Sequence, residues 1–306
     1  MIFLITGGTG LIGREFIRYR QSAYAGQDFF YVLTRQKALV YGENHESSQI
    51  MYIADLKEIP IEVHVEVVIN LSGEPVAAKR WSRKRKAALN DSRIGVTQRV
   101  IDWMKTCDRL PHVMLSGSAV GWYGDSGAED LDESSRFDEL KAPQDYAHQL
   151  CEHWEKTAMA AEALGVRVCI LRTGLVLAKN AGFLAQMILP LKLGVSGPIG
   201  SGRQYMSWIH LDDMVLMMDR LIDNGQGIFN CTAPEPTTNS EFTKSCAKVL
   251  HRWPIFFVPS WVLKLILGEL SGMLLTGQKV LPRRILNDHY QFKYPSLDQA
   301  LESVLR

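Results

Sequence analysis

The chain opens with MIFLITGGTGLIG, in which a short apolar run is followed by a stretch with glycines at positions 7, 8, 10 and 13. Residues 2–5 have the composition of a buried strand, and the apolar spacing from residue 11 onward is typical of a helix. Glycines at such a junction let the backbone come close to a pyrophosphate, while the helix N-terminus supplies free N–H donors and partial positive charge. A tight structural turn is the alternative. The position between a first strand and a first helix favours dinucleotide binding through Gly7, Thr9, Gly10 and Gly13.

The rest of the first half alternates between apolar runs and segments of helical period. Candidate strands lie at 2–5, 29–33, 50–53, 65–71, 112–118 and 166–172, and candidate helices at 11–24, 83–106 and 144–164. This alternation predicts a doubly wound parallel sheet with helices on both faces, that is, a Rossmann-like α/β fold. The near-continuous apolar run VEVVINL is typical of a strand buried on both faces.

The pattern changes after residue 172. Residues 178–206 are rich in glycine and proline, WIHLDDMVLMMDRLID indicates a strand end and a helix with Asp212 or Asp213 as N-cap, and further helices are predicted at 239–251, 260–270 and 296–305. We therefore expect two parts. Residues 1–177 plus 205–232 would form the dinucleotide-binding Rossmann domain, and residues 178–204 plus 233–306 a smaller C-terminal α/β lobe that holds the substrate.

Charge and cysteine usage exclude several kinds of partner. The 306 residues carry a formal net charge of +1, so no overall field attracts nucleic acid or an acidic membrane, and the basic run KRWSRKRK is interpreted as a solvated helix start. Five isolated cysteines without metal-ligand spacing indicate free thiols, no metal site and a reducing compartment. The N-terminus lacks a basic signal region, and the longest apolar stretch, 261–275, is interrupted by charged residues. We expect a cytoplasmic protein with a small-molecule substrate, and both a monomer and a homodimer stay open.

The end of the second strand indicates which dinucleotide is bound. A carboxylate there would accept a hydrogen bond from the adenosine ribose, whereas arginine would meet a 2′-phosphate. The sequence YVLTRQK places Thr34 and Arg35 at this point, which favours NADP over NAD; a solvated Arg35 is the alternative. Asp55, after the third strand, is within reach of the adenine. The stretch NLSG after the fourth strand borders the middle of the cofactor, through residues 71–73.

Longer stretches resemble the extended short-chain dehydrogenases/reductases, the group that contains nucleotide-sugar epimerases and dehydratases. TGGTGLIG is similar to their fingerprint, SGSAVGWYG (116–124) to their serine-bearing strand end, and WIHLDDM (208–214) to the segment that returns to the sheet. NLSGEPVAAKRW, DYAHQLCEHWE, LRTGLVL, GPIGSGRQYMSWIHLDDM and LPRRILNDHYQFKYPSLDQAL further resemble one atypical subgroup, usually called the epimerase family, with a C-terminal domain of unknown function. Some members carry the older label of cell division inhibitor. The resemblance implies an NADP(H) site and names no substrate.

The resemblance also implies a catalytic pair that this chain lacks. The wider superfamily uses a tyrosine as general acid/base and a lysine four residues later. Here Tyr146 is followed four residues later by Leu150. If Cys151 takes the place of the lysine, Ala147 takes that of the tyrosine, and Tyr146 points about 100° away around the helix.

Other groups are candidates for the missing proton partner, and a structural role is the alternative for each. Ser118 stands in the place of the superfamily's serine, and Arg93 in that of its asparagine. The catalytic candidates are Ser118 with Tyr123, or His148 or Cys151 from the helix. A cation such as Arg93 next to Cys151 would lower the pKa of the thiol, so a thiolate is one hypothesis.

The expected cofactor-binding residues are Gly7, Thr9, Gly10, Leu11, Ile12, Gly13, Thr34, Arg35, Asp55, Leu71, Ser72, Gly73, Arg93 and Val176. Arg203, in a glycine-rich turn, suits a bidentate grip on substrate phosphates, as in nucleotide-sugar enzymes; a surface arginine is the alternative. We expect an NADP(H)-binding oxidoreductase or nucleotide-sugar-epimerase-like enzyme acting on a small carbonyl or hydroxyl compound, with sugar nucleotides as one substrate class. The missing Tyr/Lys pair keeps a non-catalytic NADP-binding regulatory protein as the alternative.

Overall fold

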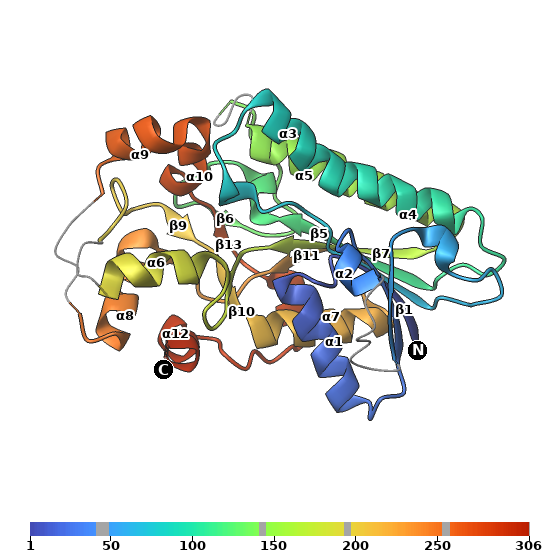
Figure 1. Ribbon diagram of the computed structural model, residues 1–306. Helices are drawn as coiled ribbons and strands as arrows, with labels where there is room; N and C mark the ends of the chain where they lie inside the picture. Colours follow the sequence, from blue (N-terminus) through green and yellow to red (C-terminus); the bar gives the residue numbers. More distant parts are fainter. Residues whose placement is uncertain (41–48, 141–144, 193–196, 253–257, 306) are drawn as a thin grey trace.

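A seven-stranded parallel sheet forms the centre of the computed structural model, which describes residues 1–40, 49–140, 145–192, 197–252 and 258–305 (Figure 1). The strand order is β11-β7-β5-β4-β1-β2-β3, and every neighbouring pair is parallel. The strands are β1 (Ile2–Thr6), β2 (Phe29–Leu33), β3 (Ile50–Ile53), β4 (Val67–Asn70), β5 (Val113–Ala119), β7 (Arg167–Thr173) and β11 (Gly227–Cys231). The predicted Rossmann-like α/β fold is confirmed, with β11 as a strand that the apolar runs did not predict.

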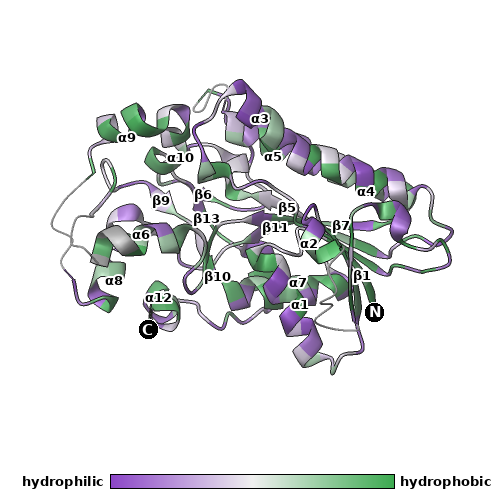
Figure 2. Ribbon diagram, viewed as in Figure 1, coloured by the Kyte–Doolittle hydropathy of each residue, from purple (hydrophilic) through white to green (hydrophobic). Residues whose placement is uncertain are grey.

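Helices cover both faces of this sheet (Figure 1). Helices α1 (Leu11–Ala23) and α7 (Leu211–Asn224) pack on one face, where Phe16 and Met214 lie in the same buried cluster as Phe3. Helices α4 (Val96–Met104) and α5 (Tyr146–Met159) pack on the other face. The strands are therefore apolar on both sides, as Figure 2 shows by their green colour. From β1 the chain continues to β2 on one side and returns to β4 on the other, so the topological switch point lies between β1 and β4.

Two predicted helices are less regular than their sequence period suggests. The predicted helix 83–106 consists of α3 (Arg83–Asn90), a π-helical segment η3 (Asp91–Gly95) and α4. The predicted helix 144–164 consists of α5 and a 3-10 segment η5 (Ala160–Leu164), while its residue 144 lies outside the described residues. A π segment inside a helix often marks a functional site, and this one carries Arg93.

The second half of the chain adds smaller units beside the sheet. Strand β8 (Leu175–Leu177) pairs with β10 (Trp208–His210), and β9 (Tyr205–Met206) pairs with β12 (Thr237–Thr238). Helices α6 (Gly182–Lys192), α8 (Asn239–Val249) and α12 (Leu297–Leu305) share a buried cluster with Trp208 and Phe242. The remaining elements are α2 (Lys37–Val40), η1 (Leu56–Glu58), η2 (Val76–Ala78), η4 (Val120–Tyr123), β6 (Asp130–Leu131), α9 (Ser260–Leu267), η6 (Gly268–Ser271), α10 (Gly272–Leu275), β13 (Lys279–Val280) and α11 (Arg283–Asn287). The proposed division into two domains stays a prediction.

The N-cap of α7 differs from the prediction of Asp212 or Asp213. His210 caps this helix, because its Nδ1 accepts a hydrogen bond from the backbone N–H of Asp212 at 3.0 Å. Asp213 is instead buried and accepts hydrogen bonds from the N–H groups of Lys293 and Tyr294. Asp212 and Asp213 therefore lie in the first turn, where their negative charge interacts favourably with the helix dipole. The capping residue, His210, comes directly before the helix.

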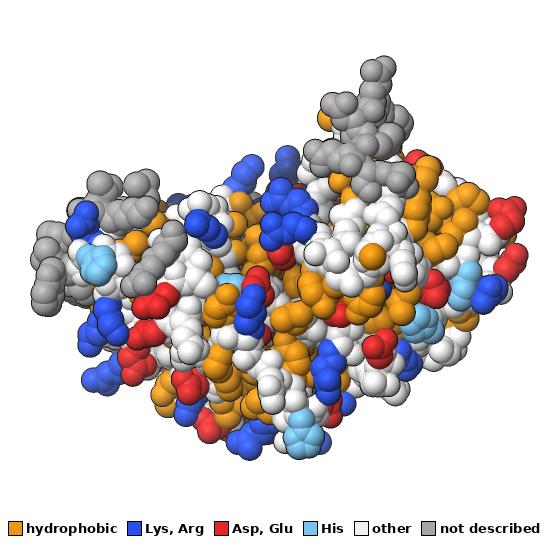
Figure 3. Space-filling model, turned by 90° about the horizontal axis from the view of Figure 1, so that it is seen from below, with side chains coloured by type: hydrophobic (Ala, Val, Ile, Leu, Met, Phe, Trp, Pro, Cys, Tyr) orange, Lys and Arg blue, Asp and Glu red, His pale blue; other side chains and the backbone are white. Residues whose placement is uncertain are grey.

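The surface shows the near-balance of charge expected from the composition. On the face seen from below in Figure 3, basic and acidic side chains are interspersed with apolar ones. Within the described residues, the structure has no helix long and apolar enough to cross a membrane.

Candidate functional site

The glycine-rich turn fits closely against the neighbouring strands. Gly7 has a φ of +73°, which L side chains rarely adopt, and a Cβ there would lie 2.5 Å from the carbonyl oxygen of Leu71. A Cβ at Gly13 would lie 2.6 Å from the carbonyl oxygen of Gly7. The N-cap of α1 is Gly10, and no side chain caps the helix. Its first-turn N–H groups therefore have no side-chain acceptor and lie at the carboxyl ends of the strands, where open parallel sheets have their ligand crevice.

Buried polar side chains hold the turn at a fixed distance from β4. Thr6 Oγ1 lies 2.8 Å from Asn70 Oδ1 and accepts a hydrogen bond from the N–H of Ser72 at 3.2 Å. The amide of Asn70 donates to Thr97 Oγ1 and Ser116 Oγ, which ties β4 to α4 and β5. The structure thus brings together residues 6–13 and residues 71–73, as the sequence predicts.

The end of β2 lies beside Glu74, the residue that follows residues 71–73. Arg35 Nη2 lies 2.7 Å from Oε1 of Glu74, and 83% of the Arg35 side chain is exposed. Thr34 is buried and its hydroxyl accepts a hydrogen bond from the N–H of Gln36. Asp55 is exposed and caps the short helix η1 by accepting from the N–H of Lys57. Arg35 therefore lies at the edge of the crevice, while Asp55 has a local structural role of its own.

Arg93 lies against the Gly73 backbone. A Cβ at Gly73 would lie 2.9 Å from the Arg93 guanidinium carbon, and Arg93 Nη2 donates to the carbonyl oxygen of Glu74 at 3.0 Å. Burial lowers the pKa of this guanidinium, which nevertheless remains a cation at neutral pH. The ring of Trp154 lies beneath it, with the guanidinium carbon 5.4 Å from the ring centroid.

Ser118 belongs to a buried ion-pair network on β5, β7 and α5. Its hydroxyl donates to Oε1 of Glu155 at 2.6 Å. Arg172 donates to both Glu155 oxygens, from Nε at 2.9 Å and from Nη2 at 2.8 Å, and only 1% of its side chain is exposed. The Ser118 proton is therefore directed at an interior carboxylate rather than at the crevice.

The other candidates for proton transfer are also engaged or buried. The Tyr123 hydroxyl lies 2.9 Å from the carbonyl oxygen of Asp132 and 2.8 Å from Oδ1 of Asn230. Burial, together with the nearby Glu155 carboxylate, raises the pKa of the Cys151 thiol to about 11, with Arg93 among the groups that oppose the shift. The raised pKa disfavours the thiolate hypothesised at Cys151, because burial disfavours the charged form more than the cation favours it.

The first turn of α5 carries Tyr146 and Ala147, the two residues that the sequence compares with the superfamily's tyrosine. Ala147 lies against Gly121 of η4, where an added Cβ would be 3.4 Å from the Ala147 methyl group. The Tyr146 hydroxyl points elsewhere and donates to the carbonyl oxygen of Lys86 at 3.1 Å. His148 is buried, and its ring stacks on Phe137 with the ring centroids 3.5 Å apart. On this helix Leu150, and not a lysine, stands four residues after Tyr146.

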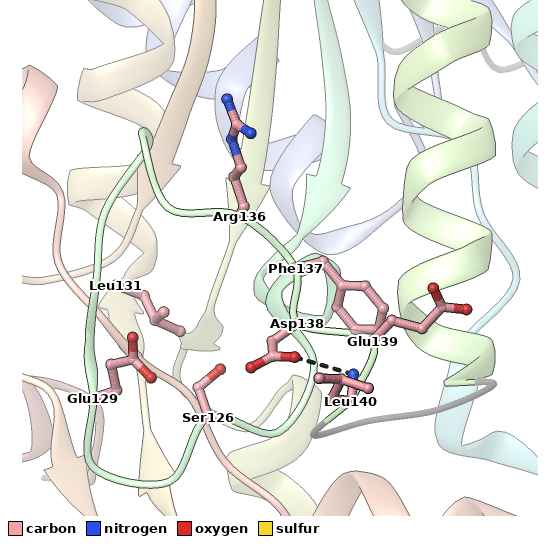
Figure 4. A pocket seen from close by; sticks show the side chains of 8 residues that line it. All are labelled: Ser126, Glu129, Leu131, Arg136, Phe137, Asp138, Glu139 and Leu140. Carbon is pink, nitrogen blue, oxygen red and sulfur yellow. Dashed lines mark hydrogen bonds between the residues drawn. The ribbon is translucent and has the colours of Figure 1, made fainter.

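A cavity of about 440 Å³ lies in the loop between η4 and α5. Figure 4 shows its lining, in which Glu129, Ser126 and Asp138 gather on one side while Arg136 points away from them. The lining side chains are those of Ser126, Glu129, Leu131, Arg136, Phe137, Asp138, Glu139 and Leu140. Three carboxylates against one guanidinium make this cavity acidic.

Two further expected residues, Val176 and Arg203, come from the second half of the chain. Val176, on β8, is near the start of α1, since a Cβ at Gly182 would lie 3.6 Å from both the Val176 carbonyl oxygen and Leu11 Cδ2. Arg203 is exposed on a turn and is not among the residues that line the described cavity. The structure therefore brings Val176 to the cofactor turn but does not bring Arg203 to the cavity.

No sequence motif pointed to a role for Glu155, Arg172 or Glu74, while Arg85 lies in the basic run KRWSRKRK that is interpreted as a solvated helix start. One signal was available for Arg172, because a charged residue closes the otherwise apolar run VRVCILR, and a buried charge needs a partner. No spacing in the sequence identifies Glu155 as that partner. The two residues meet only because α5 packs across β7.

Comparisons with known proteins agree with this architecture. A model of the NAD dependent epimerase/dehydratase family matches residues 3–232, and a model of a domain of unknown function, DUF1731, matches residues 258–304. The Arabidopsis thaliana epimerase family protein SDR39U1 homolog, chloroplastic, is 36% identical, over 100% of this chain and 87% of its own length. An epimerase family protein of Staphylococcus aureus is 34% identical, over 99% of this chain and 98% of its own.

Solved structures show the same fold. The crystal structure of human epimerase family protein SDR39U1 with NADPH has a TM-score of 0.83 at 27% identity, covering 99% of both chains. A dTDP-glucose 4,6-dehydratase from Bacillus anthracis has a TM-score of 0.76 at 17% identity, covering 100% of this chain and 95% of its own, which shows the fold alone.

Strand order, switch point and glycine-rich turn define the class, which is that of Rossmann-like α/β proteins. Within that class, the chain belongs to the NAD dependent epimerase/dehydratase family and carries the DUF1731 domain at its C-terminus. This confirms the resemblance drawn from the sequence motifs.

Proposed function

We propose that the chain binds NADP(H) at the glycine-rich turn and acts as an oxidoreductase or epimerase-like enzyme on a small carbonyl or hydroxyl compound. The uncapped first turn of α1 is the observation that carries the proposal. Its N–H groups at Leu11, Ile12 and Gly13 are suited to a pyrophosphate, and Gly7 allows the backbone to approach Leu71 closely. Arg35 at the end of β2 is suited to the adenosine 2′-phosphate.

The remaining expected residues support the same placement. Leu71, Ser72 and Gly73 lie across the crevice from the turn, and Arg93 is a cation behind them. Val176 lies near Leu11 on the other side. The bound cofactor would supply the hydride chemistry, and the protein would bind and orient it.

The side chains favour particular substrates. Ser118 and Tyr123 are held by interior acceptors, so a substrate would exchange its proton with water more readily than with either residue. We place the substrate in the cavity between η4 and α5, where the carboxylates of the lining would repel a nucleoside diphosphate. We therefore propose an uncharged carbonyl or quinone compound, in preference to a sugar nucleotide, as the substrate class.

Isothermal titration with NADPH and NADH tests the cofactor assignment. We expect NADPH to bind more tightly than NADH, and Arg35→Asp to weaken NADPH binding by roughly tenfold or more, since an arginine–phosphate contact is replaced by charge repulsion. Binding of neither nucleotide would end the proposal. Turnover is then measured as NADPH oxidation with a panel of aldehydes, quinones and nucleotide sugars.

A non-catalytic, NADP-binding regulatory protein is the second candidate. It is supported by Leu150, in place of a lysine, four residues after Tyr146, and by the burial of Cys151, which raises the pKa of this thiol to about 11. Tight NADPH binding without turnover of any compound in the panel would favour this function over the first.

A further inference from the structure

A carboxylate held between two guanidinium groups lies beside the cofactor turn. Glu74 follows Gly73 directly, and its Oε1 lies 2.7 Å from Arg35 Nη2 while its Oε2 lies 3.2 Å from Arg85 Nη1. Arg35 comes from the end of β2, and Arg85 from the first turn of α3. Three separate elements thus converge on one anionic group, and the group as a whole has one excess positive charge.

The two arginines differ in how firmly they are held. The Arg35 side chain is largely exposed, whereas 12% of the Arg85 side chain is exposed. Arg85 Nη2 donates to the carbonyl oxygen of Pro75, and its buried Nε has no hydrogen-bond partner in the described part of the chain. Arg85 is therefore a fixed cation with one unused donor, and Arg35 a cation that can move.

The backbone of Glu74 is held by two hydrogen bonds, whereas its side chain is held by the two arginines. Its N–H donates to Ser92 Oγ at 3.0 Å, and its carbonyl oxygen accepts from Arg93. Its carboxylate has only the two arginines as hydrogen-bond partners described here, and they hold the pKa of this carboxyl below its usual range, Arg35 most of all. A rotation of this side chain would leave both guanidinium groups open to another anion.

We propose that Arg85 is a second ligand of the 2′-phosphate of NADP(H), alongside Arg35, and that the Glu74 carboxylate takes the place of that phosphate in the free protein. The inference rests on the proposed function and deepens it by naming what selects the phosphorylated adenosine. A phosphate carries more charge than a carboxylate and has three strong acceptor oxygens, so it displaces Glu74 from between the arginines. Arg85 Nη1, which now contacts Glu74, would be its donor to the phosphate.

The matched variants are Arg85→Gln and Arg83→Gln, because Arg83 is an exposed arginine in the same turn of α3. Affinities for adenosine 2′,5′-bisphosphate, 5′-AMP, NADPH and NADH are measured by isothermal titration. We expect Arg85→Gln to weaken the two 2′-phosphorylated ligands by roughly tenfold or more and to leave 5′-AMP and NADH within about twofold. Arg83→Gln is expected to change none of the four.

Glu74→Gln tests the displacement directly, since it keeps the shape of the side chain and removes its charge. We expect it to tighten binding of NADPH and adenosine 2′,5′-bisphosphate several-fold without changing 5′-AMP. Arg85→Lys keeps the charge but loses the two-pronged guanidinium donor, so its affinity for the 2′-phosphorylated ligands should lie between those of the wild type and Arg85→Gln. If Arg85→Gln does not fold, Arg85→Lys and Glu74→Gln together test the inference.

The outcomes separate this inference from the proposed function. Equal weakening of all four ligands by Arg85→Gln, unchanged binding of the 2′-phosphorylated ligands, or weaker NADPH binding in Glu74→Gln would each overturn the inference while NADP(H) binding stands. If the wild-type protein binds none of the four ligands, the proposed function itself fails.

Discussion

At the scale of single residues, the interior of the site is organised by one buried charge pair. Arg172 and Glu155 are both buried, and their two hydrogen bonds satisfy most of the polar atoms that burial would otherwise leave unpaired. The Arg172 guanidinium also lies over the ring of Trp122, 3.5 Å from its centroid. Such a pair adds little net stability compared with apolar residues, but losing one partner leaves the other charge buried alone.

Glu155→Gln should therefore destabilise the protein by about 3–5 kcal/mol, because the Arg172 charge would lose its counter-ion in the interior. The free energy of unfolding, measured by urea denaturation, checks this. The control is Asp298→Asn, which breaks an exposed ion pair with Lys248 and should cost less than about 1 kcal/mol. Equally small losses in both variants would show that the buried pair is unimportant for stability.

At the scale of elements, a histidine joins the start of α7 to the C-terminal helix. His210 Nδ1 accepts from the backbone of α7, so its Nε2 carries the proton and faces Ser303 Oγ on α12 at 3.0 Å. The ring also lies against Tyr294. Burial lowers the pKa of His210 in the folded protein, with Asp212 opposing the effect and Lys293 adding to it.

This arrangement predicts a loss of stability in mild acid. Below about pH 6.5 the unfolded chain takes up a proton at His210 that the folded protein does not, so the free energy of unfolding falls with pH until the folded pKa is reached. His210→Asn keeps a capping side chain without a titrating group, and its unfolding free energy should fall less between about pH 6.5 and pH 5. His251→Asn, at an exposed position, is the control and should keep the wild-type slope. Parallel slopes in all three proteins would contradict the assignment.

At the scale of the whole molecule, the chain passes repeatedly between the central sheet and the units beside it. From β7 it runs to β8 and α6, returns through β10 to α7 and β11, and leaves again for α8. The buried cluster of α6, α8 and α12 includes Trp208 of β10, which directly precedes α7. These crossings favour unfolding of the described parts as one unit, so a ligand at the glycine-rich turn should stabilise the whole protein.

NADPH at about a hundred times its dissociation constant should stabilise the folded protein by about 2.7 kcal/mol. For a chain of this size the melting temperature should rise by roughly 5 °C, in one transition. Differential scanning calorimetry with NADPH, NADH and no nucleotide at equal concentrations checks this, with a smaller rise expected for NADH. Equal shifts for both nucleotides would argue against selection of the 2′-phosphate.

The sequence predicted the features that depend on residues close together in the chain. Strand runs, the glycine-rich turn and the basic residue Arg35 are local patterns, because a buried strand, a tight turn and a strand end each depend on neighbouring residues. The fold and the family could therefore be predicted from the sequence. The strand β11 was missed because its five residues, GIFNC, are partly polar and are stabilised by pairing with β7.

By itself the sequence determined the Rossmann-like fold, the glycine turn and the presence of Leu150, not a lysine, four residues after Tyr146. Only the tertiary structure decided that Ser118 faces Glu155, that Cys151 is buried, that His210 caps α7 and that Glu74 joins Arg35 to Arg85. The reason is that hydrogen bonds, burial and charge pairing depend on groups far apart in the chain, and only packing of the elements brings those groups within a few ångströms of each other.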